Sequence, residues 1–263
     1  MNPTETIQGI PMVAVKAGSF LMGHDWKYIP SLPETVNAYY PDEQPVRKMA
    51  VKAFQLGKYP VTQAEYSKIM GANPSFFKGD DSLPVTNIGP FEIRAFCNKL
   101  SLAAGLSPCY DEEKKTCDAS KNGFRLPTEA EWEYACRAGT STLFYTGNTE
   151  RDLDKAGWYL GNSGGTTHPV GGKTPNPWGL YDMHGNVFEF TEDDWNPSLC
   201  YGRYLPEGAP KPTFNYYHDM NITRGGSWFS EPSVCRSATR SCFCGWKAIW
   251  DCWYVGFRLA RNG

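Results

Sequence analysis

The sequence predicts an α+β fold with few regular strands and many irregular loops. Aromatic residues make up 14% of the 263 residues, and 26 Gly and 20 Pro accompany them, a composition typical of short strands and turns. Two helices carry clear start signals, whereas the second half is rich in Gly, Asn, Pro and Trp. No Pro/Ser-rich linker and no internal repeat divides the chain. We therefore expect residues 1–263 to form a single domain.

Short apolar runs predict strands in the first sixty residues. They lie at residues 12–15, 18–23 and 51–56, and the last run ends at Gly57. Residues 24–45, between the second run and the third, are polar and contain proline, which predicts a long loop.

Three helices are predicted from their first turns. Thr62-Gln-Ala-Glu65 and Thr128-Glu-Ala-Glu131 are capping boxes, in which the Thr hydroxyl and the Glu carboxylate bind free backbone N–H groups. We expect the first helix to end at Gly71 and the second before Gly139. A third helix begins at Pro90, because proline suits a first turn. Its expected buried side consists of Phe91, Ala95, Phe96 and Leu100.

Charge and hydropathy exclude two classes of partner. The 26 basic residues balance 28 acidic ones without a basic run, so no nucleic-acid interface is expected. No apolar stretch is long enough to span a membrane. The N-terminus lacks the charged and apolar regions of a signal peptide, although Met1 could also be a start that replaces a removed export signal.

The nine cysteines follow no metal-binding pattern. Their spacing is irregular and no CxxC occurs, so a zinc site is not expected. Cys97 and Cys136 lie in apolar helical patterns and are predicted to be buried thiols. Cys109 and Cys117 flank a polar stretch and could form a disulfide if the protein is exported, and their redox state stays open.

The last forty residues combine a patterned frame with an unpatterned insert. The frame consists of Arg224-Gly-Gly-Ser-Trp228 and Gly256-Phe-Arg-Leu-Ala-Arg261, and residues 241–254 between them hold three of the nine Trp and three of the nine Cys. Because loops carry recognition and aromatic side chains dominate binding interfaces, residues 229–254 are predicted to form a ligand-binding segment. The expected contact residues are Phe229, Ser230, Ser241, Cys242, Phe243, Cys244, Trp246, Ala248, Trp250, Cys252, Trp253 and Tyr254.

The competing interpretation is that these rings fill the core of a strand-poor fold. It is favoured for Trp228, which belongs to the frame, whereas surface placement is favoured for residues 241–254. Arg236, Arg240 and Arg258 are predicted to be frame residues, since planar guanidinium groups can bind several loop carbonyls at once.

A series of blocks in fixed order resembles the formylglycine-generating-enzyme (sulfatase-modifying factor) superfamily. The most specific blocks are Arg125-Leu-Pro-Thr-Glu-Ala-Glu-Trp-Glu-Tyr-Ala135, Asn176-Pro-Trp-Gly-Leu-Tyr-Asp-Met-His-Gly-Asn-Val-Phe-Glu189 and Arg224-Gly-Gly-Ser-Trp228 with Gly256-Phe-Arg258. The resemblance covers about residues 10–261. It implies an elaborated C-type-lectin-like fold with little regular secondary structure.

Enzymes of this superfamily oxidise a substrate cysteine with copper and two cysteines of their own. The resemblance places those two positions at Pro232 and Ser237, and neither supplies a thiolate for copper(I). We therefore expect no enzymatic activity and no catalytic cofactor. The alternative is a formylglycine-generating-type oxidase that acts on protein cysteine through a relocated thiol such as Cys235.

The chain also resembles family members without this chemistry, the variable proteins of diversity-generating retroelements, and among them the Treponema-type variable lipoproteins. In these proteins mutagenic reverse transcription diversifies the C-terminal segment. The resemblance implies a receptor or adhesion protein that binds an unknown protein or other macromolecular ligand. It also implies a cell-surface or extracellular location with a lipid anchor, and a cytoplasmic location stays open.

The family further implies a structural Ca²⁺ ion at a Gly-Asn-x-x-Glu step. The matching residues are Gly185, Asn186, Val187 and Glu189, and hard oxygen ligands in an irregular loop suit calcium. The alternative is that Asn186 and Glu189 are turn and network residues. Sugar binding through calcium, as in true lectins, is less favoured, because Glu231-Pro232-Ser233 only half resembles the lectin step.

Overall fold

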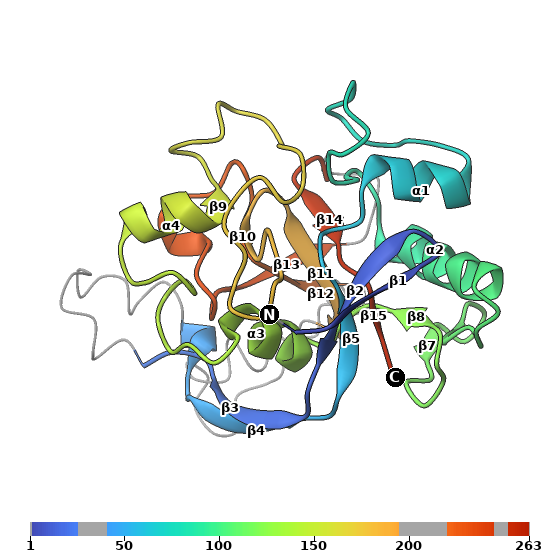
Figure 1. Cartoon of the computed structure of the whole chain (residues 1–263), viewed down its shortest axis with the longest axis horizontal. Coiled ribbons are helices and arrows are strands. Elements are labelled where there is room, and N and C mark those ends of the chain that lie inside the picture. The colour runs from blue at the N-terminus through green and yellow to red at the C-terminus, as the bar shows by residue number, and fades with distance from the viewer. Residues whose placement is uncertain (1, 26–40, 195–219, 245–251, 263) are drawn as a thin grey trace, which may run out of the picture.

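The last two strands of the chain connect its two largest sheets. The computed structural model describes residues 2–25, 41–194, 220–244 and 252–262. Strand β14 (Val255–Phe257) belongs to a four-stranded sheet, and β15 (Ala260–Arg261) belongs to a five-stranded sheet. The C-terminal frame therefore crosses from one sheet to the other within a few residues (Figure 1).

The five-stranded sheet is antiparallel throughout and has the order β1-β2-β5-β15-β8. Its other strands are β1 (Thr4–Ile7), β2 (Ile10–Val15), β5 (Phe54–Gly57) and β8 (Phe124–Arg125). The four-stranded sheet has the order β13-β12-β11-β14, with a parallel pairing only between β11 and β14. Its other strands are β11 (Phe188–Asp194), β12 (Met220–Arg224) and β13 (Arg240–Cys244).

Three small two-stranded sheets complete the described strands. They are the hairpin β3 (Gly18–Met22) with β4 (Arg47–Val51), the hairpin β6 (Tyr110–Asp111) with β7 (Thr116–Cys117), and the parallel pair β9 (Gly157–Trp158) with β10 (His184–Gly185). The strand predicted at 51–56 is divided between β4 and β5, because β4 pairs with β3 while β5 pairs with β2. Within the predicted loop 24–45, residues 41–43 form a 3-10 turn.

The predicted helix starts are confirmed. Helices α1 (Gln63–Met70) and α3 (Glu129–Arg137) begin at capping boxes of Thr62 and Thr128, and α1 ends at Gly71 in the left-handed conformation. Helix α2 (Pro90–Ala103) begins at its predicted proline. The sequence analysis missed α4 (Glu150–Ala156), whose capping box uses Asp152 in place of Glu. No helix in the described part of the chain is long and apolar enough to cross a membrane.

The buried side of α2 differs from the prediction at two residues, since neither Phe91 nor Ala95 is buried. Ile93, Phe96, Cys97 and Leu100 are buried, a set with the i, i+3, i+4, i+7 spacing of one helix face. Phe91 lies outside this stripe and is 50% exposed. The prediction of Phe91 as a core residue was therefore wrong.

The core lies on both faces of the five-stranded sheet. Successive residues of a strand point to opposite faces, and Met12 and Val13 of β2 are both fully buried, in two different apolar clusters. Phe96 of α2 belongs to one cluster, and Trp132 and Cys136 of α3 belong to the other. Helix α3 also packs against β11 and β12, so it joins the two large sheets. This position brings its polar residues under the C-terminal segment.

Thr128→Ala tests the capping box that positions α3. The Thr128 hydroxyl accepts the Glu131 N–H at 3.2 Å, and its removal leaves that donor without a partner at the helix start. We expect a loss of about 1 kcal/mol in the free energy of unfolding, measured by urea denaturation. Thr128→Ser keeps the acceptor and serves as the control. Equal destabilisation by both substitutions would contradict the capping role.

Candidate ligand-binding face

The buried Arg224 side chain organises the first part of the C-terminal segment. It lies at the end of β12 and is fully buried. Its Nη1 donates to the carbonyls of Ala238 at 2.8 Å and Thr239 at 2.5 Å, and its Nη2 donates to the carbonyl of Ser237 at 2.9 Å. One guanidinium group therefore holds three consecutive carbonyls of an irregular loop, which would otherwise be buried without donors.

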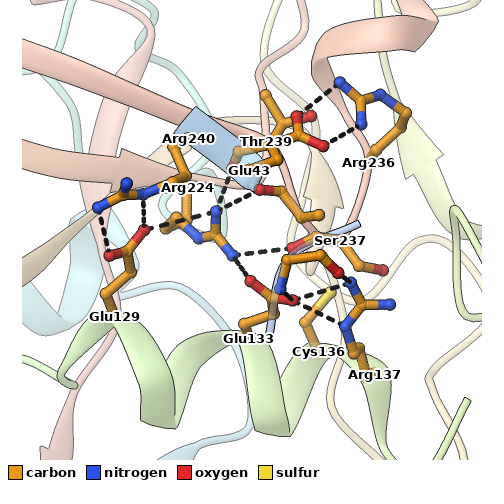
Figure 2. Close-up of polar contacts among 12 residues, drawn as sticks. Glu43, Glu129, Glu133, Cys136, Arg137, Arg224, Arg236, Ser237, Thr239 and Arg240 are labelled. Atoms are coloured by element: carbon orange, nitrogen blue, oxygen red, sulfur yellow. Dashed lines mark hydrogen bonds and ion pairs between the residues drawn. The ribbon is translucent and has the colours of Figure 1, made fainter. Parts of the chain in front are cut away.

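Helix α3 supplies the negative charges for this arrangement, as Figure 2 shows. Glu133 accepts a hydrogen bond from Nη2 of Arg224, and it also binds Arg137 Nε at 2.8 Å and the Gly23 N–H at 2.9 Å. Glu129 lies one turn earlier on the same helix face. It binds Arg240 through Nε at 2.6 Å and Nη2 at 2.9 Å. The two carboxylates thus fix the arginines at both ends of segment 224–240.

A second ion pair ties the segment to the 41–43 turn. Arg236 donates to both carboxylate oxygens of Glu43, at 2.7 and 2.8 Å, and both side chains are buried. Burial raises the pKa of the Glu43 carboxyl, while the Arg236 guanidinium opposes the shift. Arg240 Nη1 donates to the Asp42 carbonyl at 3.2 Å. Both arginines therefore hold the segment in place, as predicted, and each does so through a carboxylate as well as through carbonyl oxygen.

Arg258 fixes the other end of the segment. The fully buried guanidinium donates to the carbonyls of Gly57 at 2.8 Å, Lys58 at 3.0 Å and Tyr181 at 2.7 Å, and it also binds the Glu189 carboxylate at 2.7 Å. The frame role predicted for Arg258 is confirmed. We call Arg224, Arg236, Arg240 and Arg258, with Glu43, Glu129, Glu133 and Glu189, the arginine frame.

An aromatic cluster lies beside this frame. Trp228 is only 3% exposed, which confirms its predicted core position. Its ring centroid lies 5.3 Å from that of Phe229, 5.4 Å from Phe77 and 5.7 Å from Trp253. Phe229 is 61% exposed and Trp253 is half-buried. Buried Trp228 thus supports two rings that reach solvent, one from each end of the predicted segment.

Several predicted contact residues take other positions. Ser230 is buried, and its hydroxyl accepts the Ser227 N–H at 3.0 Å, so this side chain closes a turn instead of facing solvent. Cys252 is 9% exposed, and its carbonyl accepts the Asn87 N–H at 3.0 Å. Half-buried Tyr254 packs against Phe188. Surface placement is therefore wrong for Cys252, and the predicted contact residue Ser230 is likewise buried, because both help to hold turns.

The start of the predicted insert is regular. Ser241, Cys242, Phe243 and Cys244 belong to β13, the edge strand that pairs with β12. Ser241 and Cys242 are half-buried. Apolar and polar residues do not alternate in this stretch, which wrongly indicated a loop where the chain forms a strand. Trp246, Ala248 and Trp250 lie outside the described residues, and their predicted role stays a prediction.

The side-chain oxygens at the predicted calcium step already have protein donors. Asn186 Oδ1 accepts the His168 N–H at 3.0 Å, and its amide donates back to the His168 carbonyl. Glu189 binds Arg258 and accepts the Trp132 indole N–H at 2.7 Å. Because a calcium ion would have to displace these donors, this arrangement does not fit the ion and favours the alternative of turn and network residues. Gly185 and Val187 are buried beside them, and calcium binding itself stays a prediction.

The positions that the resemblance assigns to catalytic cysteines are filled by other residues. The Ser237 hydroxyl is fully buried and donates to the Leu143 carbonyl at 3.0 Å. Burial raises the pKa of the nearby thiols Cys136 and Cys235 to about 12. Across residues 2–25, 41–194, 220–244 and 252–262, no group of three or more His, Cys, Asp or Glu is arranged to hold a metal ion.

His184 fills the space between these two thiols. Its Nδ1–H donates to the Cys235 carbonyl at 2.7 Å, its Nε2 accepts the Tyr145 N–H at 3.1 Å, and the Cys136 sulfur lies 3.9 Å from Nε2. Burial lowers the pKa of His184 to about 3. The hydrogen bond to the Cys235 carbonyl raises this pKa, whereas the positive charge of Arg137 lowers it. The imidazole is therefore neutral and structural at neutral pH.

The family model of the sulfatase-modifying factor enzyme 1-like domain matches residues 1–263. The chain belongs to this family. Treponema denticola variable protein 1 superposes with a TM-score of 0.79 and 30% identity over 99% of both chains. PvdO from Pseudomonas aeruginosa superposes with a TM-score of 0.75 and 25% identity, over 100% of this chain and 98% of that one. These neighbours confirm the predicted α+β, C-type-lectin-like fold.

Sequence relatives include both enzymes and proteins with other names. The formylglycine-generating enzyme of Mycobacterium tuberculosis is 26% identical over 290 residues, which cover 88% of this chain and 91% of the relative. The chaperone protein LppX of Paenibacillus barcinonensis is 30% identical over 218 residues, which cover 70% of this chain and 72% of the relative. Membership of the sulfatase-modifying factor family therefore does not by itself decide whether the chain is an enzyme.

Sequence reasoning missed the residues that bind the frame arginines in this family member. Glu43 lies 193 positions before Arg236, and Glu133 lies 91 positions before Arg224. Glu129 and Glu133 carried one available signal, since residues four apart on a helix share a face and the helix itself was predicted.

Glu133→Gln tests the centre of the arginine frame. The substitution removes the charge that compensates buried Arg224, so we expect a loss of roughly 3–5 kcal/mol in the free energy of unfolding. Urea denaturation measures the loss, and Glu113→Gln, at an exposed position, is the control. A loss below about 1 kcal/mol would show that the pair does not support the frame.

His184 gives a pH prediction. Its pKa is about 3 when folded against 6.5 when unfolded, so the unfolded chain binds an extra proton between these values. The contribution to stability is complete above pH 6.5 and is lost as the pH falls toward 3. From pH 7 to pH 5 we expect about 2 kcal/mol more loss in the wild type than in His184→Gln. An imidazole NMR signal that titrates near pH 6.5 in the folded protein would contradict this account.

Proposed function

We propose that the protein is a non-enzymatic ligand-binding protein of the receptor or adhesion type, with a variable C-terminal surface on a fixed scaffold. The observation that carries this proposal is the contrast within the C-terminal segment. Its frame arginines are buried or nearly buried and are held by carboxylates and carbonyls, while Phe229 is 61% exposed and Trp253, on the same Trp228 ring, is half-buried. A rigid support for exposed rings suits binding, because preorganised loops lose less entropy on association.

Two exposed aromatic side chains are enough to anchor an interface. A large ring buries about 150–250 Å² on full contact, which corresponds to roughly 4–6 kcal/mol at about 25 cal/mol per Å² before association costs. Phe229 and Trp253 are already partly covered by Trp228, so each contributes less than this. The likeness to Treponema denticola variable protein 1 supports diversification of this surface by a retroelement in the present chain as well.

The residues at the family's reaction centre support the absence of oxidase chemistry. The two positions that would hold thiolates are Pro232 and Ser237, and the relocated candidate Cys235 is fully buried with its pKa raised to about 12. A protonated, enclosed thiol is a poor copper(I) ligand and a poor nucleophile. The alternative function, a formylglycine-generating oxidase, therefore lacks its soft ligands at the expected place.

A cell-surface or extracellular location with a lipid anchor belongs to the same proposal. Its support is the likeness to a variable protein of the Treponema type. Membrane fractionation of cells that produce the native gene product, followed by detection of a lipid-modified cysteine, is the direct check. A product found only in the soluble cytoplasmic fraction would contradict the anchor.

Copper and aldehyde measurements separate the proposal from the oxidase alternative. We expect no tight copper(I) binding in a competition with a chelator, and no aldehyde on a cysteine-containing peptide by mass spectrometry, because Ser237 and Pro232 supply no thiolate. The Mycobacterium tuberculosis formylglycine-generating enzyme is the positive control. Aldehyde formation that is lost in Cys235→Ser would contradict the non-enzymatic function.

Phe229→Ser and Trp253→Ser test the binding face. A partner is first captured from a mixture of surface-exposed and secreted proteins and is identified. Its affinity for each variant is then measured. We expect at least tenfold weaker binding for both variants, or about 1.4 kcal/mol. Leu21→Ser, which removes a 62% exposed side chain on the distant β3, is the matched control. Equal affinity for all variants would contradict a binding role for this face.

A further inference from the structure

The loop after α1 places an exposed ring beside the C-terminal segment. Phe76 is 63% exposed, and its ring centroid lies 5.2 Å from that of Trp253 and 5.0 Å from that of Phe77. Phe77 in turn makes an edge contact with Trp228. Phe76 lies more than 150 positions before Trp228 in the sequence, so the face that includes Phe229 and Trp253 extends beyond the C-terminal segment.

The position of this loop is fixed by amide side chains, of which Gln63 is fully buried. Gln63, at the start of α1, donates to the Phe77 carbonyl at 2.8 Å and accepts from Asn73 Nδ2 at 2.7 Å. Asn87 donates through its side chain to the Pro74 carbonyl at 3.0 Å and through its backbone N–H to the Cys252 carbonyl at 3.0 Å. Asn87 thus connects the loop directly to the C-terminal segment, and Phe76 is held in place before any ligand binds.

A third exposed apolar residue is bonded through its backbone to the C-terminal segment. Leu160 is 44% exposed, and its backbone N–H donates to the Ser230 carbonyl at 3.0 Å. The hydroxyl of Ser163, three residues later in the chain, donates to the Trp228 carbonyl at 2.8 Å. Phe229 packs directly on Trp228, and Phe76 reaches it through Phe77 and Trp253. With Leu160, these are three of the six large apolar side chains that the described residues expose. Such clustering marks an interaction surface more strongly than single exposed side chains do.

The buried indole of Trp228 points to a ligand with a hydrogen-bond acceptor. Trp228 is 3% exposed, and its Nε1–H has no acceptor among the described residues. A buried donor without a partner costs free energy, and Trp N–H groups usually find an acceptor when buried. A carbonyl oxygen of a bound chain would satisfy this donor.

We propose that Phe76 forms a fixed part of the binding face, which we call the shoulder, and that this face takes a polypeptide segment carrying apolar and basic side chains. This inference rests on the proposed ligand-binding function and deepens it. The shoulder lies outside the segment that would vary, so it would contribute the same contacts to every variant of the protein.

The charges on these segments favour a basic partner. Asp80, Asp81 and Glu231 are exposed on the two segments that carry Phe76 and Phe229, against one exposed lysine, Lys78. Hydrogen bonds from Ser82 lower the pKa of Asp80, so this carboxylate is charged at neutral pH. Acidic residues around an apolar centre are complementary to a segment that combines Lys or Arg with apolar side chains.

The ring geometry favours a polypeptide over a sugar. The planes of Phe76 and Trp253 are inclined by 53°, those of Phe77 and Trp228 by 83°, and those of Trp228 and Phe229 by 54°. These tilted rings form no common flat platform for the broad face of a sugar ring. Their edges and the spaces between them suit individual side chains of a peptide, whose carbonyls also supply the acceptor for Trp228.

Selection from a random library of phage-displayed 12-residue peptides against the full chain tests the inference. We expect selected peptides to be enriched in Lys and Arg together with Leu, Phe or Trp. A synthetic selected peptide should bind Phe76→Ser and Phe229→Ser at least tenfold more weakly than the wild type, and Leu21→Ser equally well. Asp81→Lys, in the same loop as Phe76, should also weaken binding and should reduce its dependence on salt.

The outcomes separate the inference from the function on which it rests. Weaker binding to Phe229→Ser with unchanged binding to Phe76→Ser overturns the shoulder and leaves the proposed function standing. Unchanged binding to both variants contradicts both proposals. Enrichment of acidic peptides overturns the charge assignment, and binding to an immobilised glycan panel without any peptide enrichment overturns the polypeptide assignment. Thermal unfolding of each variant confirms that a loss of binding does not come from a loss of folding.

Discussion

The C-terminal segment depends on the hydrogen bonds and the ion pair of the buried Arg224 guanidinium. This group joins Glu133 of α3 to the carbonyls of three successive loop residues, 237–239, in the buried interior. A buried arginine is stabilising when its charge is compensated and its donors are bound nearby, and Nη1 and Nη2 of Arg224 meet this condition while its Nε has no partner among the described residues. Helix α3, capped by Thr128, supplies that charge at a fixed position, so the helix and the irregular loop support each other.

This arrangement explains how an irregular half-chain can still be rigid. Backbone groups outside helices and sheets need other partners when they are buried, and here side chains provide them. Arg258 binds three carbonyls from two distant loops, Asn87 connects the loop after α1 to Cys252, and Arg236 holds the 41–43 turn through Glu43. The residues that reach solvent, such as Phe229, take no part in these bonds and are free to change without loss of the frame.

Local signals in the sequence predicted local structure well, whereas pairings between distant residues were not predictable from it. The capping boxes at Thr62 and Thr128 gave correct helix starts because every partner lies within one turn. The start of α4 was not predicted, because its capping box has Asp152 at the position where the usual pattern has Glu. Trp228 was placed correctly, but the partners of Arg224 and Arg236 depend on the fold, and Ser230 turns inward for a local hydrogen bond that a loop pattern does not reveal. The exposure of Phe76 likewise depends on the fold, and no pattern in the sequence pointed to it.

The most direct test of the account replaces residues 245–251 with an unrelated Gly/Ser/Asn sequence of equal length. Hydrogen exchange of the Ser237 amide, which donates to the Leu143 carbonyl, and of the Thr239 amide, which donates to Arg236, then reports on the frame. The account predicts unchanged protection of both amides and a free energy of unfolding within about 1 kcal/mol of the wild type. Rapid exchange of both amides, or unfolding of the variant, would contradict the account, because the arginine frame would then depend on residues 245–251.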